Sequence, residues 1–358
     1  MRAAFFCYLI DPTSDITGFI LDWVRALASQ VESLEVIALE VKDPASAGLP
    51  TNVRLHSLGR EEGFGRGRLL LNSQRAVHLA LGRADFVLCH MMPLYAILAA
   101  PLCRLHKKPL FLWYTHAHLD LKLRTAAALA DRVFTAEPES MRVATAKKRV
   151  VGHGIDTQRF RPAPPRPENG RLTVLSVGRL SPIKRPHLLI EAAKLLKEKN
   201  QLEGFRFIIA GQAGTPAQEA YVHELKERVR TFGLSGAVEF RGPVPFSRVD
   251  GLYQEADCFV SMQTQRNFDK VVLEAMASGL PTVVANPSFT SLLGRQVENL
   301  LYDGNKPAQL AERLVNLARQ SPAQRRAMGL ELREGVRAGH ELNRLMARIA
   351  AEAASLRG

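Results

Sequence analysis

The chain has 358 residues, of which 46% are hydrophobic and 23% charged, the composition of a folded globular protein and not of a fibre or a disordered tail. Its length exceeds the ~250–300 residues at which single cores stop growing, so we expect two domains. A formal charge of +13 indicates a surface that attracts phosphate groups, which nucleic acids, anionic lipids and nucleotides all carry.

Strand-like and helix-like segments alternate from the first residue. The expected strands are 3–10, 34–41, 53–59, 84–90, 109–116, 132–136 and 148–156, and the expected helices are 18–29, 69–81 and 121–130. Such alternation is typical of a largely parallel sheet covered on both faces. We therefore predict an α/β fold, with a Rossmann-like domain over residues 1–160.

Residues 161–170, RPAPPRPENG, form the predicted linker, because four prolines there replace any periodicity. The alternation then restarts, and it predicts a second Rossmann-like domain over residues 171–335. The following residues, 336–358, have the pattern of a C-terminal helix, which we place at the domain junction as a hypothesis. Ligands of such folds bind at the carboxyl ends of the strands.

Neither a membrane span nor a secretion signal is expected. The apolar start of the chain is too short for a signal peptide. The most apolar window, residues 86–105, contains His90, Pro93 and Pro101, which favour a strand, a turn and a short helix. The four cysteines lack a C-x-x-C spacing, so we expect no zinc site and a reducing, cytoplasmic compartment. No Walker A loop and no H-E-x-x-H motif occurs either, and we expect no bound metal or cofactor.

The first candidate site follows the strand that opens the second domain. Gly178 allows a close backbone approach, and Arg179 and Lys184 emerge at the carboxyl end of that strand, where they can neutralise a diphosphate. Without further evidence, an arginine and a lysine at this spacing are equally typical of a basic loop exposed to solvent.

A second candidate lies about ninety residues later. Asn267 is expected to cap a helix whose first turn begins at Phe268, and the amides of a helix N-terminus bind phosphate. Glu274 stands among apolar residues of this helix, so its carboxylate must be paired or directed into a cleft. A carboxylate can accept both hydroxyls of a ribose, although a lone glutamate is more often a surface residue.

The chain resembles family 4 glycosyltransferases with the GT-B fold in the order and spacing of several segments. Those of the second half are SVGRLSPIKRPHLLIEA, FIIAG, VEFRGPVP, LYQEADCFVS and DKVVLEAMASGLPTVVAN, and those of the first half are WYTHAH and VVGHGIDTQRFRP. Chance is a poor explanation for so many motifs in order. The resemblance covers residues 85–300 clearly and implies two Rossmann-like domains that face each other across a cleft.

This resemblance implies an enzyme, a hexosyltransferase-like protein that transfers a sugar from a nucleotide-diphosphate sugar with retention and without an obligatory metal. Arg179 and Lys184 would hold the diphosphate, and Glu274 would bind the ribose. The stretch from Asn267 to Lys270 matches the helix start whose amides face the phosphates. The donor-binding set implied is therefore Gly178, Arg179, Lys184, Asn267, Phe268, Asp269, Lys270 and Glu274.

The sequence departs from the family at two positions around the start of this helix. Arg266 stands where the first glutamate of the E-x7-E motif is expected, and Asp269 replaces a common glycine. No sugar identity can therefore be carried over. Arg266 either faces a phosphate or carboxylate of the substrate or points to solvent.

The first domain contributes three further candidates. His116 is the closer match to the family histidine that contacts the donor sugar near the reacting carbon, and His118 follows it. Gly18 stands in place of the family's Gly-Gly turn after the first strand. Because a histidine at a strand end is usually structural, the functional role expected of His116 rests on the resemblance.

Basic residues concentrate in the expected acceptor domain. Between Arg60 and Arg149 lie 15 basic and 7 acidic residues, an excess of eight within the chain's +13. This suggests a lipid-linked, envelope or otherwise anionic acceptor at the inner surface of the cell membrane, with residues 69–71 at the interface. A soluble basic surface is the alternative.

Other functions stay open at this point. A relative of the same fold can epimerise or phosphorolyse a nucleotide sugar, and Arg266 also fits a catalytically impaired member. A basic, non-catalytic binding protein is a further alternative. Binding to nucleic acid is not expected, because no recognition helix and no basic strand with interleaved aromatic residues stands out.

Overall fold

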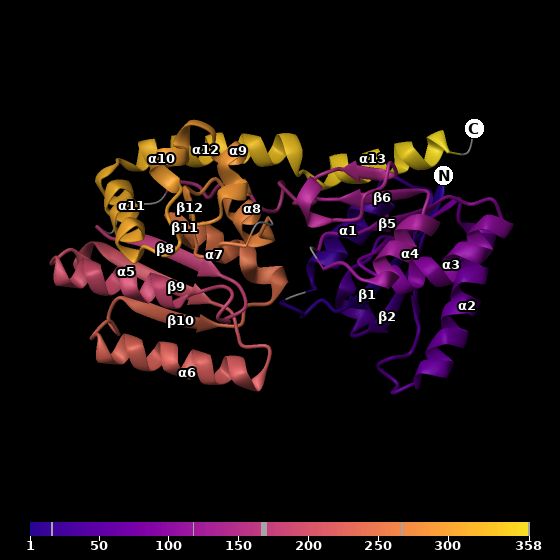
Figure 1. Cartoon of the computed structure of the whole chain (residues 1–358), viewed down its shortest axis with the longest axis horizontal. Coiled ribbons are helices and arrows are strands. Elements are labelled where there is room, and N and C mark those ends of the chain that lie inside the picture. Colours follow the sequence, from indigo (N-terminus) through magenta and orange to yellow (C-terminus); the bar gives the residue numbers. More distant parts are fainter. Residues whose placement is uncertain (16, 117, 166–169, 266–267, 357–358) are drawn as a thin grey trace. The chain divides into compact units, whose positions relative to one another are not determined.

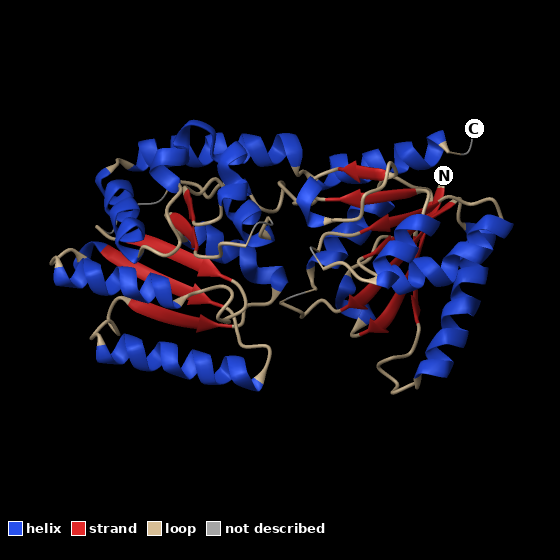
Figure 2. Ribbon diagram, in the orientation of Figure 1, coloured by secondary structure: helices blue, strands red, loops and turns tan. Residues whose placement is uncertain are grey.

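The computed structural model describes the chain except residues 16, 117, 166–169, 266–267 and 357–358 (Figure 1). It divides into two compact units. The first comprises Met1–Asp156, Pro245–Ser247 and Gly339–Gly358, and the second comprises Thr157–Val244 and Arg248–Ala338. Each unit contains a parallel sheet flanked by helices, so the predicted α/β class is confirmed (Figure 2).

The sheet of the first unit has seven strands within the described residues, in the order β3-β2-β1-β4-β5-β6-β7. They are β1 (Arg2–Ile10), β2 (Ser33–Val41), β3 (Val53–Ser57), β4 (Phe86–His90), β5 (Leu110–Trp113), β6 (Arg132–Thr135) and β7 (Lys148–Val150). The predicted first strand is confirmed as β1, which lies inside the sheet between β2 and β4. Its residues 3–7 are fully buried, which explains their continuous apolar run.

Helices cover both faces of this sheet. One face packs against α1 (Phe19–Ala28) and the C-terminal helix α13 (Leu342–Ser355), with Trp23 and Leu345 in the core. The other face packs against α2 (Arg66–Arg83), α3 (Pro93–Leu105) and α4 (Leu121–Leu129), with Val77, Ala96 and Leu123 in the core. The C-terminal helix α13 thus completes the core of the first unit.

The sheet of the second unit has the order β10-β9-β8-β11-β12 within the described residues. Its strands are β8 (Leu172–Val177), β9 (Phe205–Ala210), β10 (Val238–Gly242), β11 (Cys258–Ser261) and β12 (Thr282–Val284). Its helices are α5 (His187–Glu198), α6 (Pro216–Thr231), α7 (Val249–Glu255), α8 (Lys270–Ala277), α9 (Thr290–Leu293), α10 (Val297–Leu300), α11 (Pro307–Arg319) and α12 (Pro322–Gly339).

In each sheet the strand order reverses beside the first strand of the unit. The chain proceeds outward from β1 to β3 and then returns to β4 on the other side of β1, and it proceeds from β8 to β10 and then returns to β11. The loops that follow β8 and β11 consequently diverge at a topological switch point, where ligands of open parallel sheets bind.

A close backbone approach holds the loops after β8 and β9 together. Gly178 donates its backbone N–H to the carbonyl of Ala210 at 3.0 Å, and Gly211 has a φ of +136°. A Cβ atom at Gly211 would lie 1.9 Å from the carbonyl oxygen of Gly178. Only glycine fits this position, both for its backbone conformation and for the space available.

We predict that Gly211→Ala lowers the free energy of unfolding by about 2–4 kcal/mol, because strained backbone and a steric overlap add together. Gly236→Ala is the matched control, since open space surrounds Gly236 and its φ is not positive. Urea unfolding of the two variants measures the difference. Equal stabilities would contradict the assigned role of Gly211.

Candidate functional site

The carboxyl edge of the second sheet presents an exposed cation directly after β8. Arg179 follows Gly178 and is exposed, and its guanidinium has no ion-pair partner among the described residues. The backbone beside it is fixed, because Leu180 donates its N–H to the carbonyl of Gln212 at 2.9 Å. A free guanidinium on a fixed backbone is suited to bind an anion through several hydrogen bonds.

Lys184 lies in the same loop and is held in place by two acceptors. Its Nζ donates to Oε1 of Gln263 at 2.7 Å and to Oδ2 of Asp269 at 2.5 Å. The Lys184 side chain is 30% exposed and that of Asp269 is 14% exposed. Both acceptors come from the segment after β11, which pairs with β8. The ammonium is thus oriented at the switch point of the sheet.

Helix α8 begins two residues later than the sequence predicts. It starts at Lys270 and its N-cap is Asp269, so the prediction that its first turn begins at Phe268 is wrong. Phe268 instead packs its ring against Phe289, with 4.7 Å between the centroids. This contact holds residue 268 in the loop before the helix. Arg266 and Asn267 lie outside the described residues.

Glu274 is buried and paired, as its apolar neighbours predict. Its side chain is on α8, the residue is 3% exposed, and its Oε2 accepts a hydrogen bond from the hydroxyl of Tyr253 at 3.0 Å. Burial raises the pKa of Glu274 to about 7, while the charge of Lys270 and the Tyr253 hydroxyl act in the opposite direction. A carboxyl group with a pKa near neutrality, one turn from a helix start, fits a ligand-binding position.

The first unit places its three candidates at the carboxyl edge of its own sheet. His116 follows β5 and is exposed, and its Nδ1 accepts the backbone N–H of His118 at 3.0 Å. Gly18 precedes α1, and a Cβ atom there would lie 2.6 Å from the carbonyl oxygen of Ser14. Gly18 thus has a packing role in the loop after β1, and the order of strands puts β4 between that loop and His116.

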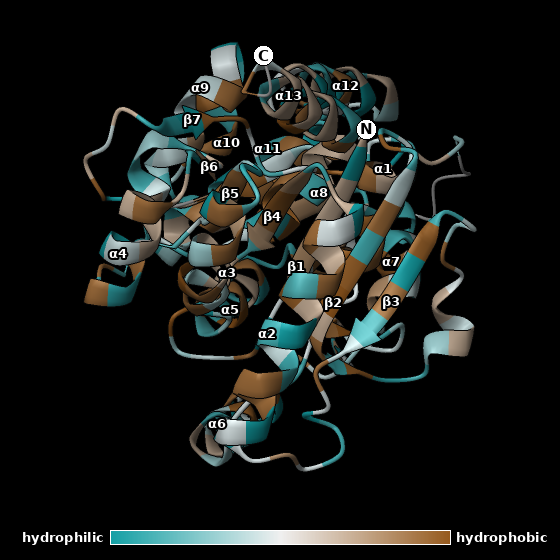
Figure 3. Cartoon of the chain, turned by 90° about the vertical axis from the view of Figure 1, so that its right-hand side faces the viewer, coloured by the Kyte–Doolittle hydropathy of each residue, from teal (hydrophilic) through white to brown (hydrophobic). Residues whose placement is uncertain are grey.

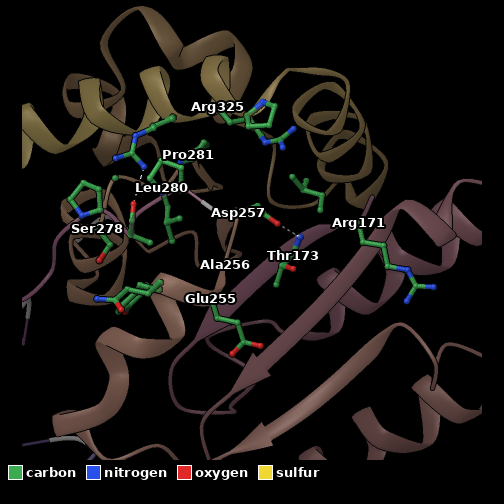
Figure 4. Close-up of a pocket in the computed structure, with 18 of the residues that line it drawn as sticks. Arg171, Thr173, Glu255, Ala256, Asp257, Ser278, Leu280, Pro281 and Arg325 are labelled. Carbon is green, nitrogen blue, oxygen red and sulfur yellow. Dashed lines mark hydrogen bonds between the residues drawn. The ribbon is translucent and has the colours of Figure 1, made fainter. Parts of the chain in front are cut away.

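A cavity of about 730 Å³ in the second unit lies at the opposite, amino edge of the strands (Figure 4). Its wall includes Arg171 and Thr173 at the start of β8, and Asp257 just before β11. Asp257 accepts the backbone N–H of Thr173 at 2.7 Å. Because ligands of parallel sheets bind at the carboxyl ends, this cavity does not belong to the candidate site.

Two residues of the site were not predicted from the sequence. Gln263 is 4% exposed and anchors Lys184, and Tyr253 on α7 anchors Glu274. Gln263 comes two residues after β11, so a polar residue directly after a buried strand was the available signal. Tyr253 gave no such signal. As for metals, the described residues contain no group of three or more His, Cys, Asp or Glu placed to hold an ion.

The raised pKa of Glu274 predicts how stability depends on pH. Since this pKa lies above the ordinary 4.5, the native state keeps a proton that the unfolded chain loses, and the free energy of unfolding falls from pH 4.5 to about pH 7. Glu274→Gln cannot titrate. Its stability relative to the wild type should therefore rise by about 2–3 kcal/mol between pH 5 and pH 8.

Urea unfolding at the two pH values measures this change. Glu227→Gln on the exposed surface of α6 is the control, because its pKa is lowered by Arg230 and it is ionised at both pH values. If the difference in unfolding free energy between Glu274→Gln and the wild type does not change with pH, Glu274 is ionised throughout this range despite its burial.

Comparisons with known proteins agree with this geometry. Residues 157–333 match the family model described as glycosyl transferases group 1. The D-inositol 3-phosphate glycosyltransferase of Frankia alni is 31% identical over 182 residues, which are 48% of this chain and 44% of that protein. The mannosylfructose-phosphate synthase of Agrobacterium fabrum is 35% identical over 111 residues, 31% of this chain and 24% of that protein. The chain thus aligns with less than half the length of these relatives.

The fold is shared along nearly the whole chain. The structure of Anabaena HepE in complex with UDP superposes with a TM-score of 0.76 and 18% identity, and covers 99% of this chain and 100% of that one. WaaG, a glycosyltransferase involved in lipopolysaccharide biosynthesis, superposes with a TM-score of 0.66 and 17% identity over 98% and 99% of the two chains. These superpositions confirm the predicted GT-B fold, and the second unit is similar in sequence to the group 1 glycosyl transferases.

Proposed function

We propose that this protein is a retaining glycosyltransferase that moves a sugar from a nucleotide-diphosphate sugar to an acceptor hydroxyl. One observation carries the proposal: Lys184 pairs with Asp269 at the start of α8 where the strand order reverses in the second sheet, and Arg179 stands in the same loop as Lys184. Two cations and a helix N-terminus form a site for a diphosphate.

The residues of this site act on the leaving group. As the bond between the sugar and the diphosphate breaks, negative charge grows on the phosphate oxygens. Arg179 and Lys184 interact more strongly with this growing charge than with the intact donor, which lowers the barrier. Gly178 keeps the backbone close to the phosphates, and the amides of Asp269 and Lys270 at the start of α8 supply further donors.

Glu274 holds the nucleoside part of the donor. Its carboxyl oxygens accept the two ribose hydroxyls, while Tyr253 keeps one oxygen in a fixed orientation through its hydrogen bond of 3.0 Å. Loss of a hydrogen bond to a charged acceptor typically costs ~1.5–3 kcal/mol. Since Glu274 is already buried before the donor arrives, little desolvation remains to be done on binding.

The resemblance to the family supports a role for His116 beside the reacting carbon of the donor sugar. His118 supports the His116 ring by its backbone N–H, and Gly18 shapes the loop after β1. Asn267, Phe268 and Arg266 precede the start of α8 and complete the proposed donor-side set. None of these roles requires a bound metal.

We predict that Arg179→Ala and Lys184→Ala each lower kcat/KM about 10- to 100-fold, because each removes a charge-assisted contact with the leaving group. The double variant should lose less than the product of the two factors, since both residues act on one diphosphate. Arg230→Ala, which removes an exposed ion pair on α6, is the control.

Turnover of UDP-, GDP- and ADP-sugars measures these rates, and product analysis distinguishes transfer from epimerisation, phosphorolysis and hydrolysis. If both single variants turn over donors at the wild-type rate, Arg179 and Lys184 do not act on the leaving group. A wild type that binds these donors and turns none of them over would identify a catalytically impaired member.

The acceptor is proposed to be lipid-linked or otherwise anionic, and the first unit to bind the inner surface of the cell membrane. On α2, Arg66, Arg68 and Arg75 are exposed together with Leu70 and Leu71, which are 46% and 61% exposed. Figure 3 shows hydrophilic and hydrophobic bands alternating on this helix. Basic residues contribute ~1 kcal/mol each near an anionic surface, and exposed leucines add apolar contact.

Attachment would be peripheral in this proposal. Within the described residues, no helix is both long and apolar enough to pass through a bilayer. The same surface also suits a membrane-bound glycan acceptor of the cell envelope.

Reversal of the charges at Arg66, Arg68 and Arg75 to glutamate should abolish co-sedimentation with vesicles that contain anionic lipid. Binding of the wild type should weaken as salt rises, because surface attraction is screened. The control reverses three exposed charges of the second unit, Lys199, Lys226 and Arg319. Equal recovery of the wild type with anionic and neutral vesicles at low salt would contradict the membrane proposal.

A further inference from the structure

Lys184 already has an anionic partner before any donor binds. Its ammonium lies between the carboxylate of Asp269 and the amide oxygen of Gln263, which together use two of its three N–H donors. Gln263 is neutral and Asp269 carries a charge. The positive charge that the proposed diphosphate site relies on is therefore partly cancelled by the protein itself.

The backbone position of Asp269 makes this partnership unusual. Asp269 is the N-cap of α8, yet its side chain forms no capping hydrogen bond. Asp120, the N-cap of α4, behaves in the ordinary way, since its Oδ1 accepts the N–H of Leu123 at 2.8 Å. An N-cap aspartate that caps its helix gains typically ~1 kcal/mol, which Asp269 gives up in favour of Lys184.

Two consequences follow from the orientation of Asp269. The carboxylate does not accept a first-turn amide of α8, and the N–H of Val272 donates to the backbone carbonyl of Asp269 at 3.0 Å instead. In addition, any phosphate that binds Lys184 must share the ammonium with Asp269 or displace it. The Asp269 side chain is only 14% exposed, so its repulsion of a nearby phosphate is weakly screened by solvent.

We infer that Asp269 is an internal anion that orients Lys184 in the free protein and weakens the binding of the nucleoside diphosphate product. This inference rests on the proposed function, because it assumes that the diphosphate binds at Lys184. Asp269 acts through Lys184 and is a positioning residue. Its charge favours release of the product, and the third N–H of Lys184 remains for the phosphate.

Calorimetric titration of the full chain with UDP, GDP and ADP tests the inference. For the diphosphate that binds the wild type, Asp269→Asn should lower Kd about 3- to 10-fold, because the amide still accepts from Lys184 but carries no charge. Affinity for the matching monophosphate should change less than about twofold, and product inhibition by the diphosphate should become stronger. Glu227→Gln, which removes a charge from α6, should leave all affinities unchanged.

A second variant tests the same charge in the opposite direction. Gln263→Glu places another carboxylate on the Lys184 ammonium and should weaken diphosphate binding at least about threefold. Unchanged or weaker binding by a folded Asp269→Asn would overturn the inference, as would unchanged binding by Gln263→Glu. A wild type that binds none of the three diphosphates would instead contradict the proposed function.

Discussion

The parallel sheet of the second unit imposes the constraint on which the candidate site depends. Parallel strands end at one edge, and the order β10-β9-β8-β11-β12 makes β8 and β11 neighbours although residues 178–257 separate the end of β8 from the start of β11. The loops after these two strands leave the carboxyl edge in opposite directions. Lys184 and Asp269 meet there because of this topology, and neither segment alone would create the pair.

A close glycine contact and buried polar groups keep this edge rigid. Gly211 lets its backbone approach Gly178, so the loop that carries Arg179 cannot move away from β9. Glu274 is costly to bury, and its raised pKa expresses that cost. Tyr253 offsets part of it through one hydrogen bond. The protein thus gives up some stability to keep a carboxyl group in a water-poor position, a common feature of ligand sites.

The sequence was informative wherever a local rule sufficed. The alternation of strands and helices predicted both sheets. The position of Arg179 and Lys184 directly after a strand predicted that they lie at the carboxyl edge of the second sheet. The start of α8 was predicted two residues early, since Asn267 has the side chain of a good cap while the packing of Phe268 on Phe289 depends on the tertiary fold. Contacts across 79 and 85 residues, such as those of Lys184 with Gln263 and Asp269, require knowledge of which strands are neighbours.

Calorimetric titration of the wild type with nucleoside diphosphates and their matching monophosphates tests the central claim most directly, which is that the edge formed by β8 and β11 binds a diphosphate. The account predicts that at least one of UDP, GDP and ADP binds about tenfold or more tightly than its monophosphate, and that raised salt reduces this preference. Equal affinity for the two classes, or no measurable binding of any diphosphate, would contradict it.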